Sequence, residues 1–176
     1  MSLSFPQLTT PRLLLRAFTE ADIPGLMALA GNYEVARHTL NIPHPYTEAD
    51  ARHWLHLTQQ GHAQGTAHAF ALELRATGEF IGGIGLTREP RFDRAEAGYW
   101  LGQPYWGRGL ATEALAALLR FGFEELKLNK NLCNAPSRQS GFGRRDAQEW
   151  HGKGRRTGAA QETRWAILRL AAIPPH

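Results

Sequence analysis

The chain of 176 residues contains a single cysteine, Cys133. One thiol allows no internal disulfide, which indicates a cytoplasmic protein held together by its core and its hydrogen bonds. The sequence also lacks any apolar run of about 18 residues, so we predict no membrane span. Its first residues lack the basic and apolar segments of a secretory signal, so we expect no export.

Most of the chain has no excess of basic residues over acidic ones. Residues 1–130 hold 12 Lys and Arg against 13 Asp and Glu, a net charge of −1. Residues 131–176 hold 8 against 3, a net charge of +5, so the overall +4 comes from this segment alone. Nucleic acid requires a basic surface, and we therefore do not expect it to be a partner of the main part of the chain.

A set of metal ligands is also missing. Of the eight histidines, His53 and His56 stand three residues apart on an expected helix and could share a face. A zinc site needs at least three protein ligands, and no third candidate stands near them. We predict no metal site.

The apolar pattern that is present predicts an α+β domain. We expect strands at 12–17, 67–75, 79–87 and 94–101, and helices at 19–30, 47–60 and 110–126. Thr47 and Asp50 form a capping-box pattern at the start of the second helix, and Gly61 is expected to end it. The segment between the first two helices is expected to be a loop.

The turn at Gln103–Ala114 carries the clearest functional signal. It joins the expected strand at 94–101 to the helix that begins near Leu110, and it contains a Gly-x-Gly step at Gly107 and Gly109. Glycines let backbone N–H groups approach an anion closely, and the helix dipole adds partial positive charge. The sequence therefore predicts a phosphate site. The alternative is a turn that needs glycine only for close packing.

Three segments together resemble the GNAT superfamily of N-acetyltransferases, and more narrowly its RimJ/RimL-type branch. They are the first-strand segment Leu8–Arg16, the hairpin made of Phe80–Leu86 and Ala95–Gly102, and the turn Gln103–Ala114. They occur in the order that the family shows. One departure is Pro104, which stands where the wider superfamily often has Gln or Arg.

The resemblance implies a GNAT fold, a mixed and mostly antiparallel sheet flanked by helices, with acetyl-CoA as co-substrate. The implied cofactor-binding residues are Trp100, Leu101, Gly102, Trp106, Gly107, Arg108, Gly109, Leu110, Ala111 and Thr112. Glu96 is the implied general base, acting through a water, with a solvent-facing strand glutamate as the alternative. Tyr33 and His38 are candidates for substrate binding, with plain packing roles as the alternative.

Residues 131–176 depart from the family. They are polar and rich in glycine and show no clear period, and the fifth strand and the Asn-Pro-Ala-Ser segment of relatives are not visible there. We interpret residues 1–130 as the acetyltransferase domain and 131–176 as an aberrant basic tail produced by a frameshift near Asn131. A genuine divergent tail is the alternative. An unbroken reading frame in the coding DNA, or a well-packed fifth strand at Asn131, would count against the frameshift.

The sequence thus predicts transfer of an acetyl group from acetyl-CoA to a primary amine, on a small molecule or at a protein N-terminus. Two alternatives are an acyl-CoA-binding remnant without catalysis and a nucleic-acid-binding module that uses the tail. The family's general acid, a Ser or Tyr, has no matching residue here, because Ser137 and Ser140 do not fit the pattern. A homodimer is left open.

Overall fold

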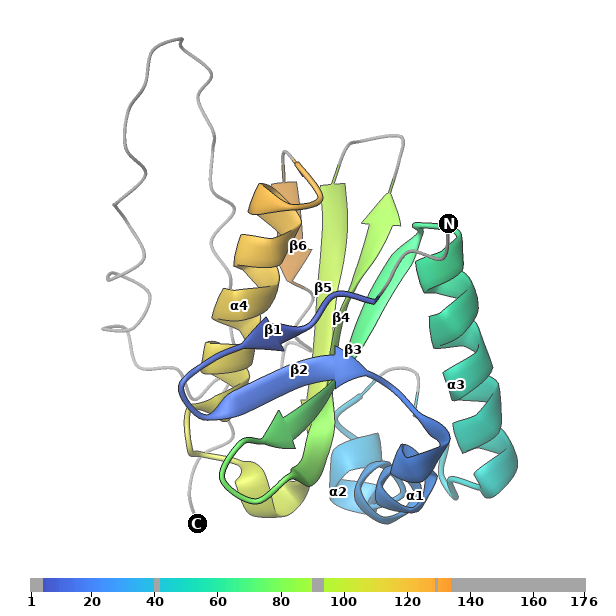
Figure 1. Ribbon diagram of the computed structural model, residues 1–176. Helices are drawn as coiled ribbons and strands as arrows, with labels where there is room; N and C mark the ends of the chain where they lie inside the picture. The colour runs from blue at the N-terminus through green and yellow to red at the C-terminus, as the bar shows by residue number, and fades with distance from the viewer. Residues whose placement is uncertain (1–4, 40–41, 90–93, 129, 134–176) are drawn as a thin grey trace, which may run out of the picture.

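A computed structural model describes residues 5–39, 42–89, 94–128 and 130–133. One six-stranded sheet forms its centre, with the strands in sequence order from one edge to the other (Figure 1). The strands are β1 (Leu8–Thr9), β2 (Leu13–Ala17), β3 (Ala67–Leu74), β4 (Glu79–Glu89), β5 (Arg94–Leu101) and β6 (Lys130–Cys133). The helices are η1 (Glu20–Asp22), α1 (Ile23–Ala30), α2 (Tyr33–Ala36), α3 (Glu48–Ala63), η3 (Gln103–Tyr105) and α4 (Leu110–Glu124).

The sheet is mixed and mostly antiparallel, as the sequence predicted. Strands β1 to β5 pair antiparallel, and only β6 runs parallel to its neighbour β5. A parallel pair needs a crossover connection, and α4 supplies it between β5 and β6. This crossover places the start of α4 at the end of β5.

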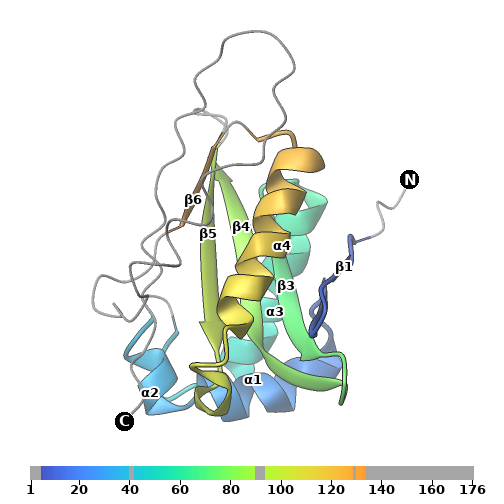
Figure 2. The ribbon, with the colours of Figure 1, turned by 90° about the vertical axis from the view of Figure 1, so that its left-hand side faces the viewer.

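Helices cover both faces of the sheet. Figure 1 shows α4 on one side of β4 and β5 and α3 on the other, and Figure 2 shows the same arrangement with α4 nearer the viewer. The larger core lies under α4 and includes Phe70, Leu72 and Leu118, all fully buried. A smaller core lies under α1 and α3 around Phe18 and Leu55. In the described part of the chain no helix is long and apolar enough to cross a membrane.

Most predicted elements are confirmed, and β5 has the predicted bounds. The prediction that Gly61 ends the second helix was wrong, because α3 continues to Ala63. Gly61 is buried there, and a Cβ at this position would lie 2.9 Å from the Cβ of Ala67 on β3. Its glycine therefore serves the close packing of α3 on the sheet. The expected loop between the first two helices contains the short helix α2, whose first turn is capped by Asn32.

A short strand, β6, lies where the sequence showed no sign of the fifth strand of relatives. Strand β6 pairs with β5 from Arg94↔Lys130 to Ala97↔Cys133. The frameshift interpretation of residues 131–176 stays a prediction. The rest of the predicted tail, residues 134–176, lies outside the described residues.

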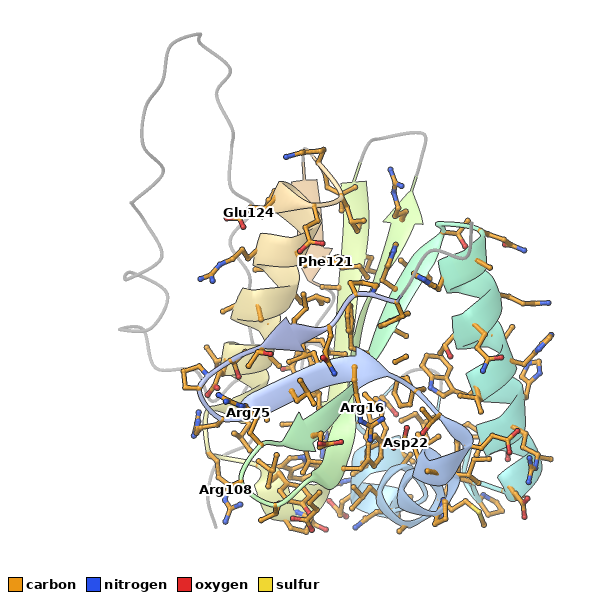
Figure 3. The ribbon with its side chains drawn as sticks, in the orientation of Figure 1. Arg16, Asp22, Arg75, Arg108, Phe121 and Glu124 are labelled. Atoms are coloured by element: carbon orange, nitrogen blue, oxygen red, sulfur yellow. The ribbon has the colours of Figure 1, made fainter. Side chains whose placement is uncertain are left out.

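A buried ion pair fixes the path from β2 into α1. The Arg16 guanidinium donates to both carboxylate oxygens of Asp22, at 2.9 and 2.8 Å, and to Glu73 at 2.7 Å (Figure 3). Asp22 is 3% exposed. Burial by itself would raise the pKa of Asp22, but the hydrogen bonds from Arg16 and from the Thr19 N–H hold it below its usual value. The bidentate pair with Asp22 and the single bond to Glu73 together define one geometry for the Arg16 side chain.

A second buried polar group, His68, lies among aromatic rings at the start of β3. Its ring centroid lies 5.3 Å from that of His62 and 5.4 Å from that of Phe121. Its Nδ1 is buried and has no hydrogen-bond partner among the described residues. Burial, together with the nearby His62 and Arg88, lowers the pKa of His68 from 6.5 to about 4. The folded protein therefore keeps this histidine neutral.

We predict that His68 makes the protein sensitive to mild acid. The unfolded state binds a proton at His68 below about pH 6.5 and the folded state only below about pH 4. Its contribution, up to about 3 kcal/mol, is therefore complete above pH 6.5 and is lost as the pH falls toward 4. Urea unfolding between pH 7.5 and 4.5 should show this slope in the native protein and in His56→Gln, an exposed-histidine control, but not in His68→Phe. An equal slope in His68→Phe would contradict the assignment.

Candidate functional site

The end of β5 presents a backbone N–H to the side away from β4. The Gly102 N–H donates to the Ile81 carbonyl, and the Trp100 carbonyl oxygen lies 2.3 Å from where a Cβ of Gly82 would stand. Both groups therefore face β4. Backbone direction alternates along an antiparallel strand, so the N–H and carbonyl of Leu101 face the opposite edge.

The described part of the partner strand on that opposite edge, β6, ends at Cys133. Its register with β5 ends at Ala97, four residues earlier in the strand. The carbonyl of Leu101 accepts a hydrogen bond of 2.8 Å from the Trp106 indole. The Leu101 side chain is buried in the core under α4. Only its backbone N–H is thus directed outward at the end of the strand.

Side chains tie the turn after β5 to the strands, in addition to the backbone hydrogen bonds of η3. Trp106 reaches back to the strand end, and the Tyr105 hydroxyl donates to the Glu79 carboxylate at 2.6 Å. Burial and this bond to Glu79 raise the pKa of Tyr105 to about 12. The turn is therefore tied both to β5 and to the start of β4.

The turn then enters α4 through two glycines in the left-handed region. Gly107 has φ +73° and Gly109, the N-cap of α4, has φ +71°. No side chain caps the helix, so the N–H groups of its first turn have no side-chain acceptor. Their partial positive charge favours an anion at this end. Arg108, between the glycines, is exposed, and Figure 3 shows its side chain extending outward from the turn.

The first turn of α4 is anchored by an ion pair from the other end of the sequence. Glu113 accepts from the Thr10 hydroxyl at 2.6 Å, the Arg12 backbone N–H at 2.8 Å and the Arg12 guanidinium at 2.6 Å. Arg12 also donates to the Arg108 carbonyl at 2.9 Å. Burial alone would raise the pKa of Glu113, but these bonds hold it below its usual value. The carboxylate therefore stays ionised and is directed toward Arg12.

The sequence did not predict this anchor as part of the site. Its members stand in two of the segments that resemble relatives, Leu8–Arg16 and Gln103–Ala114. That shared resemblance was the available signal. The contact itself joins residues about 100 positions apart, and no local pattern indicates it.

The corner between α1 and α2 packs on the same turn. The side chain of Asn32 donates to the Gln103 amide oxygen at 3.0 Å, and the His38 ring lies 6.1 Å from the Trp106 ring. Of the two predicted substrate-binding residues, His38 therefore adjoins the turn. Tyr33 is 58% exposed and packs near His44, with ring centroids 5.4 Å apart.

The predicted base, Glu96, lies at the opposite end of β5 from the turn. Its side chain is exposed, and it pairs in register with Thr87 on β4 and Leu132 on β6. Five residues of strand separate Glu96 from Leu101, which corresponds to about 16 Å between their Cα atoms. A carboxylate at this distance reaches a reaction near Leu101 only through water or through a substrate that spans the gap.

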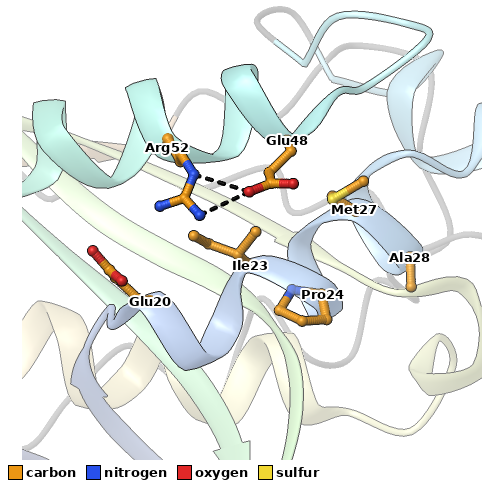
Figure 4. Close-up of a pocket in the computed structure, with 7 residues that line it drawn as sticks. All are labelled: Glu20, Ile23, Pro24, Met27, Ala28, Glu48 and Arg52. Carbon is orange, nitrogen blue, oxygen red and sulfur yellow. Dashed lines mark hydrogen bonds and ion pairs between the residues drawn. The ribbon is translucent and has the colours of Figure 1, made fainter.

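A surface hollow between α1 and α3 contains none of these residues. Figure 4 shows apolar side chains of α1 on one side of it and the Glu48–Arg52 ion pair along α3 on the other. Its lining consists of Glu20, Ile23, Pro24, Met27, Ala28, Glu48 and Arg52. We place the candidate site at the β5–α4 turn, where donors converge, rather than in this hollow.

The arrangement at the turn has two chemical capabilities. The uncapped end of α4 and the glycine turn offer several backbone donors to a phosphate group. The Leu101 N–H, at the neighbouring strand end, offers one donor to a carbonyl oxygen that gains negative charge. Among the residues that the structure describes, no three His, Cys, Asp or Glu side chains gather as a metal site would require.

Comparisons with known proteins show what this chain is similar to. The family model of the acetyltransferase (GNAT) domain matches residues 12–144. The uncharacterized N-acetyltransferase p20 of Bacillus licheniformis is 34% identical over 125 residues, which span 70% of this chain and 69% of that protein.

Two solved structures share the fold. An acetyltransferase from Agrobacterium tumefaciens str. C58 has a TM-score of 0.62 at 28% identity, over 84% of this chain and 81% of that one. RimL, a ribosomal L7/L12 alpha-N-protein acetyltransferase in complex with coenzyme A, has a TM-score of 0.58 at 22% identity, over 66% and 67%. At that identity, the likeness to RimL concerns the fold alone.

We predict that Glu113→Ala destabilises the protein by about 1–3 kcal/mol, because it leaves the Thr10 and Arg12 donors without their acceptor. Glu48→Ala is the matched control, since Glu48 also lies in the first turn of a helix and pairs with an arginine. Both members of that pair are 56% exposed, so its loss should cost much less than the loss of Glu113. Chemical denaturation of the two variants measures the difference, and equal losses would contradict the anchoring role.

Proposed function

Because this chain belongs to the GNAT family of acetyltransferases, we propose that it transfers the acetyl group of acetyl-CoA to the nitrogen of a primary amine. The observation that carries this proposal is the uncapped start of α4, with its two left-handed glycines, beside the outward N–H of Leu101. Phosphate donors and a carbonyl donor at neighbouring positions suit a long thioester substrate that has a pyrophosphate at one end and an acyl group at the other.

The backbone would hold most of acetyl-CoA. In this arrangement the N–H groups of Gly109, Leu110, Ala111 and Thr112 surround the pyrophosphate, and Arg108 adds a cation at the exposed rim. Leu101 and Leu110 are buried, so they contribute their backbone and not their side chains. Trp106 fixes the turn through its bond to Leu101 rather than by direct contact. RimL in complex with coenzyme A, which shares the fold, supports this choice of co-substrate.

The transfer needs a free amine and a stabilised oxyanion. The amine nitrogen attacks the thioester carbon, and the carbonyl oxygen becomes negative beside the Leu101 N–H. The C–S bond then breaks, and the thiolate leaves with the electron pair. Glu96 would take the proton of the amine through a chain of water molecules, since its carboxylate is exposed on the strand that carries Leu101 but lies several residues from the strand end. Holding amine and thioester together supplies much of the rate.

The acceptor would reach the thioester from the side of α1 and α2. His38 adjoins Trp106 there, and Tyr33 is exposed on α2. Acceptors to consider are small amines and protein N-termini, because the fold is shared with an acetyltransferase of a ribosomal protein N-terminus.

We predict that Gly107→Ala weakens acetyl-CoA binding about tenfold. An alanine at φ +73° costs about 1–2 kcal/mol, which shifts the turn away from the conformation that directs its N–H groups to the phosphate. Gly65→Ala is the matched control, because Gly65 has φ +65° and equally open surroundings but stands in another loop. Titration calorimetry with acetyl-CoA measures both. Equal affinities in the two variants would place the phosphates elsewhere, and no binding by the native protein would refute the proposal.

We predict that Glu96→Gln lowers kcat about 100-fold and leaves acetyl-CoA affinity unchanged, because it removes a base and preserves its size. The variant's rate should also keep rising with pH as more of the amine loses its proton. Glu124→Gln, at the far end of α4 in Figure 3, is the control. A native protein that binds acetyl-CoA but acetylates none of a mixture of amines would be a binding remnant instead, and a Glu96→Gln variant within twofold of native would refute the base.

A further inference from the structure

The face of β5 that carries Glu96 is the face away from α4. The core under α4 takes the odd-numbered side chains of the strand, among them Ala95, Ala97 and Leu101. Since side chains alternate along a strand, Glu96, Gly98 and Trp100 share the other face, on the side of α1 and α3. Trp100 packs there with Phe80, at 6.0 Å between ring centroids.

On β4 and β5, the middle of this face consists of glycines. Gly98 on β5 stands opposite Gly85 on β4. A Cβ at Gly85 would lie 2.9 Å from the His68 carbonyl oxygen, so the neighbouring strand β3 leaves no room for a side chain at Gly85. A Cβ at Gly98 would meet no atom of the described residues within 4 Å, and Gly98 is exposed. In the part of the chain that the structure describes, open space therefore lies over Gly98.

Two residue pairs on the same face, Gly83 with Trp100 and Thr87 with Glu96, form the ends of this open space. On one side Trp100 lies over Gly83, because a Cβ at Gly83 would stand 2.9 Å from the Trp100 indole nitrogen. On the other side stand Thr87 and the exposed Glu96. The Cα atoms of Glu96 and Trp100 are about 13 Å apart along the strand, so the slot is a few ångströms wide between their side chains.

Resting on the proposed function, we propose that the acceptor lies on this face of the sheet, in the slot over Gly98. Gly98 is then a specificity-determining residue for the acceptor. The slot fits a primary ammonium group on a slender, unbranched chain. Glu96 attracts the ammonium before it loses its proton, and the Trp100 ring provides an apolar wall that also tolerates a cation. The slot runs along the strand from Glu96 to Trp100, the residue before Leu101, so an acceptor in it extends from the base toward the strand end.

The position allows a clean test, because a side chain at Gly98 should not disturb the fold. Gly98 is absent from the glycines with positive φ, and its Cβ would have space. A β-branched residue suits a strand better than glycine does. Gly82 and Gly83 differ, because a Cβ at either would collide with Trp100. Gly98→Val should therefore fold with an unchanged or higher Tm.

The experiment compares native protein, Gly98→Ala, Gly98→Val and the isosteric control Thr87→Val, which changes the same face without adding bulk. Acceptors are spermidine and a short peptide with a free N-terminal serine, each varied at saturating acetyl-CoA. We expect Gly98→Val to lower kcat/KM for the acceptor that uses the slot at least tenfold, Gly98→Ala to lower it less, and both to keep the KM for acetyl-CoA within twofold. The acceptor that is affected identifies the source of the amine.

Binding of the two amines in the presence of CoA, followed by calorimetry, tests the slot without turnover. If the native protein binds one amine and Gly98→Val binds it at least tenfold more weakly, the proposal that the acceptor binds in the slot is supported even where no acetyl transfer is detected. Unchanged acceptor binding and kinetics in Gly98→Val, an equal loss for acetyl-CoA, or no amine binding by the native protein would each overturn the proposal.

Discussion

The candidate site depends on a helix end that the chain leaves without an internal acceptor. The first-turn donors of α4 need a negative group, and the acidic side chain in that turn, Glu113, is held away by Thr10 and Arg12. Because Arg12 also binds the Arg108 carbonyl, the same contact fixes the glycine turn. The partial positive charge at the start of α4 is thus kept free for a ligand and held in one geometry.

Side chains alternate between the two faces of β5, and the two faces have different roles in the site. Its odd-numbered side chains fill the core under α4, which keeps the strand rigid, while the Leu101 N–H is directed outward at the strand end. Its even positions, from Glu96 to Trp100, face the side of α1 and α3. One strand therefore presents a backbone donor along its edge and a carboxylate on its face. The structure holds both on a regular element, where positions are defined more closely than in loops.

Local patterns in the sequence predicted the fold well and the site in part. The alternation of 94–101 and the apolar stripe of α4 gave elements close to those observed, because their signals come from near neighbours. Gly61 was misread, since a glycine in a helix can mark either its end or a close contact that only the tertiary structure reveals. The Arg12–Glu113 anchor follows from the packing of α4 beside the first strands, which one sequence does not encode locally. The 16 Å between Glu96 and Leu101 follows from the spacing of residues along one strand. The frameshift hypothesis for residues 131–176 stays a prediction.

Glycine has three different uses within about thirty residues of this chain, and the sequence alone does not separate them. Gly82 and Gly83 leave room for Trp100, because a side chain at either position would collide with atoms of Trp100. Gly107 and Gly109 need a left-handed backbone. Gly98 has neither requirement, since its backbone accepts any residue and its surroundings are open. A strand normally gains from a side chain at such a position. The absence of a side chain at Gly98 leaves an open space, and we infer that this space has a function.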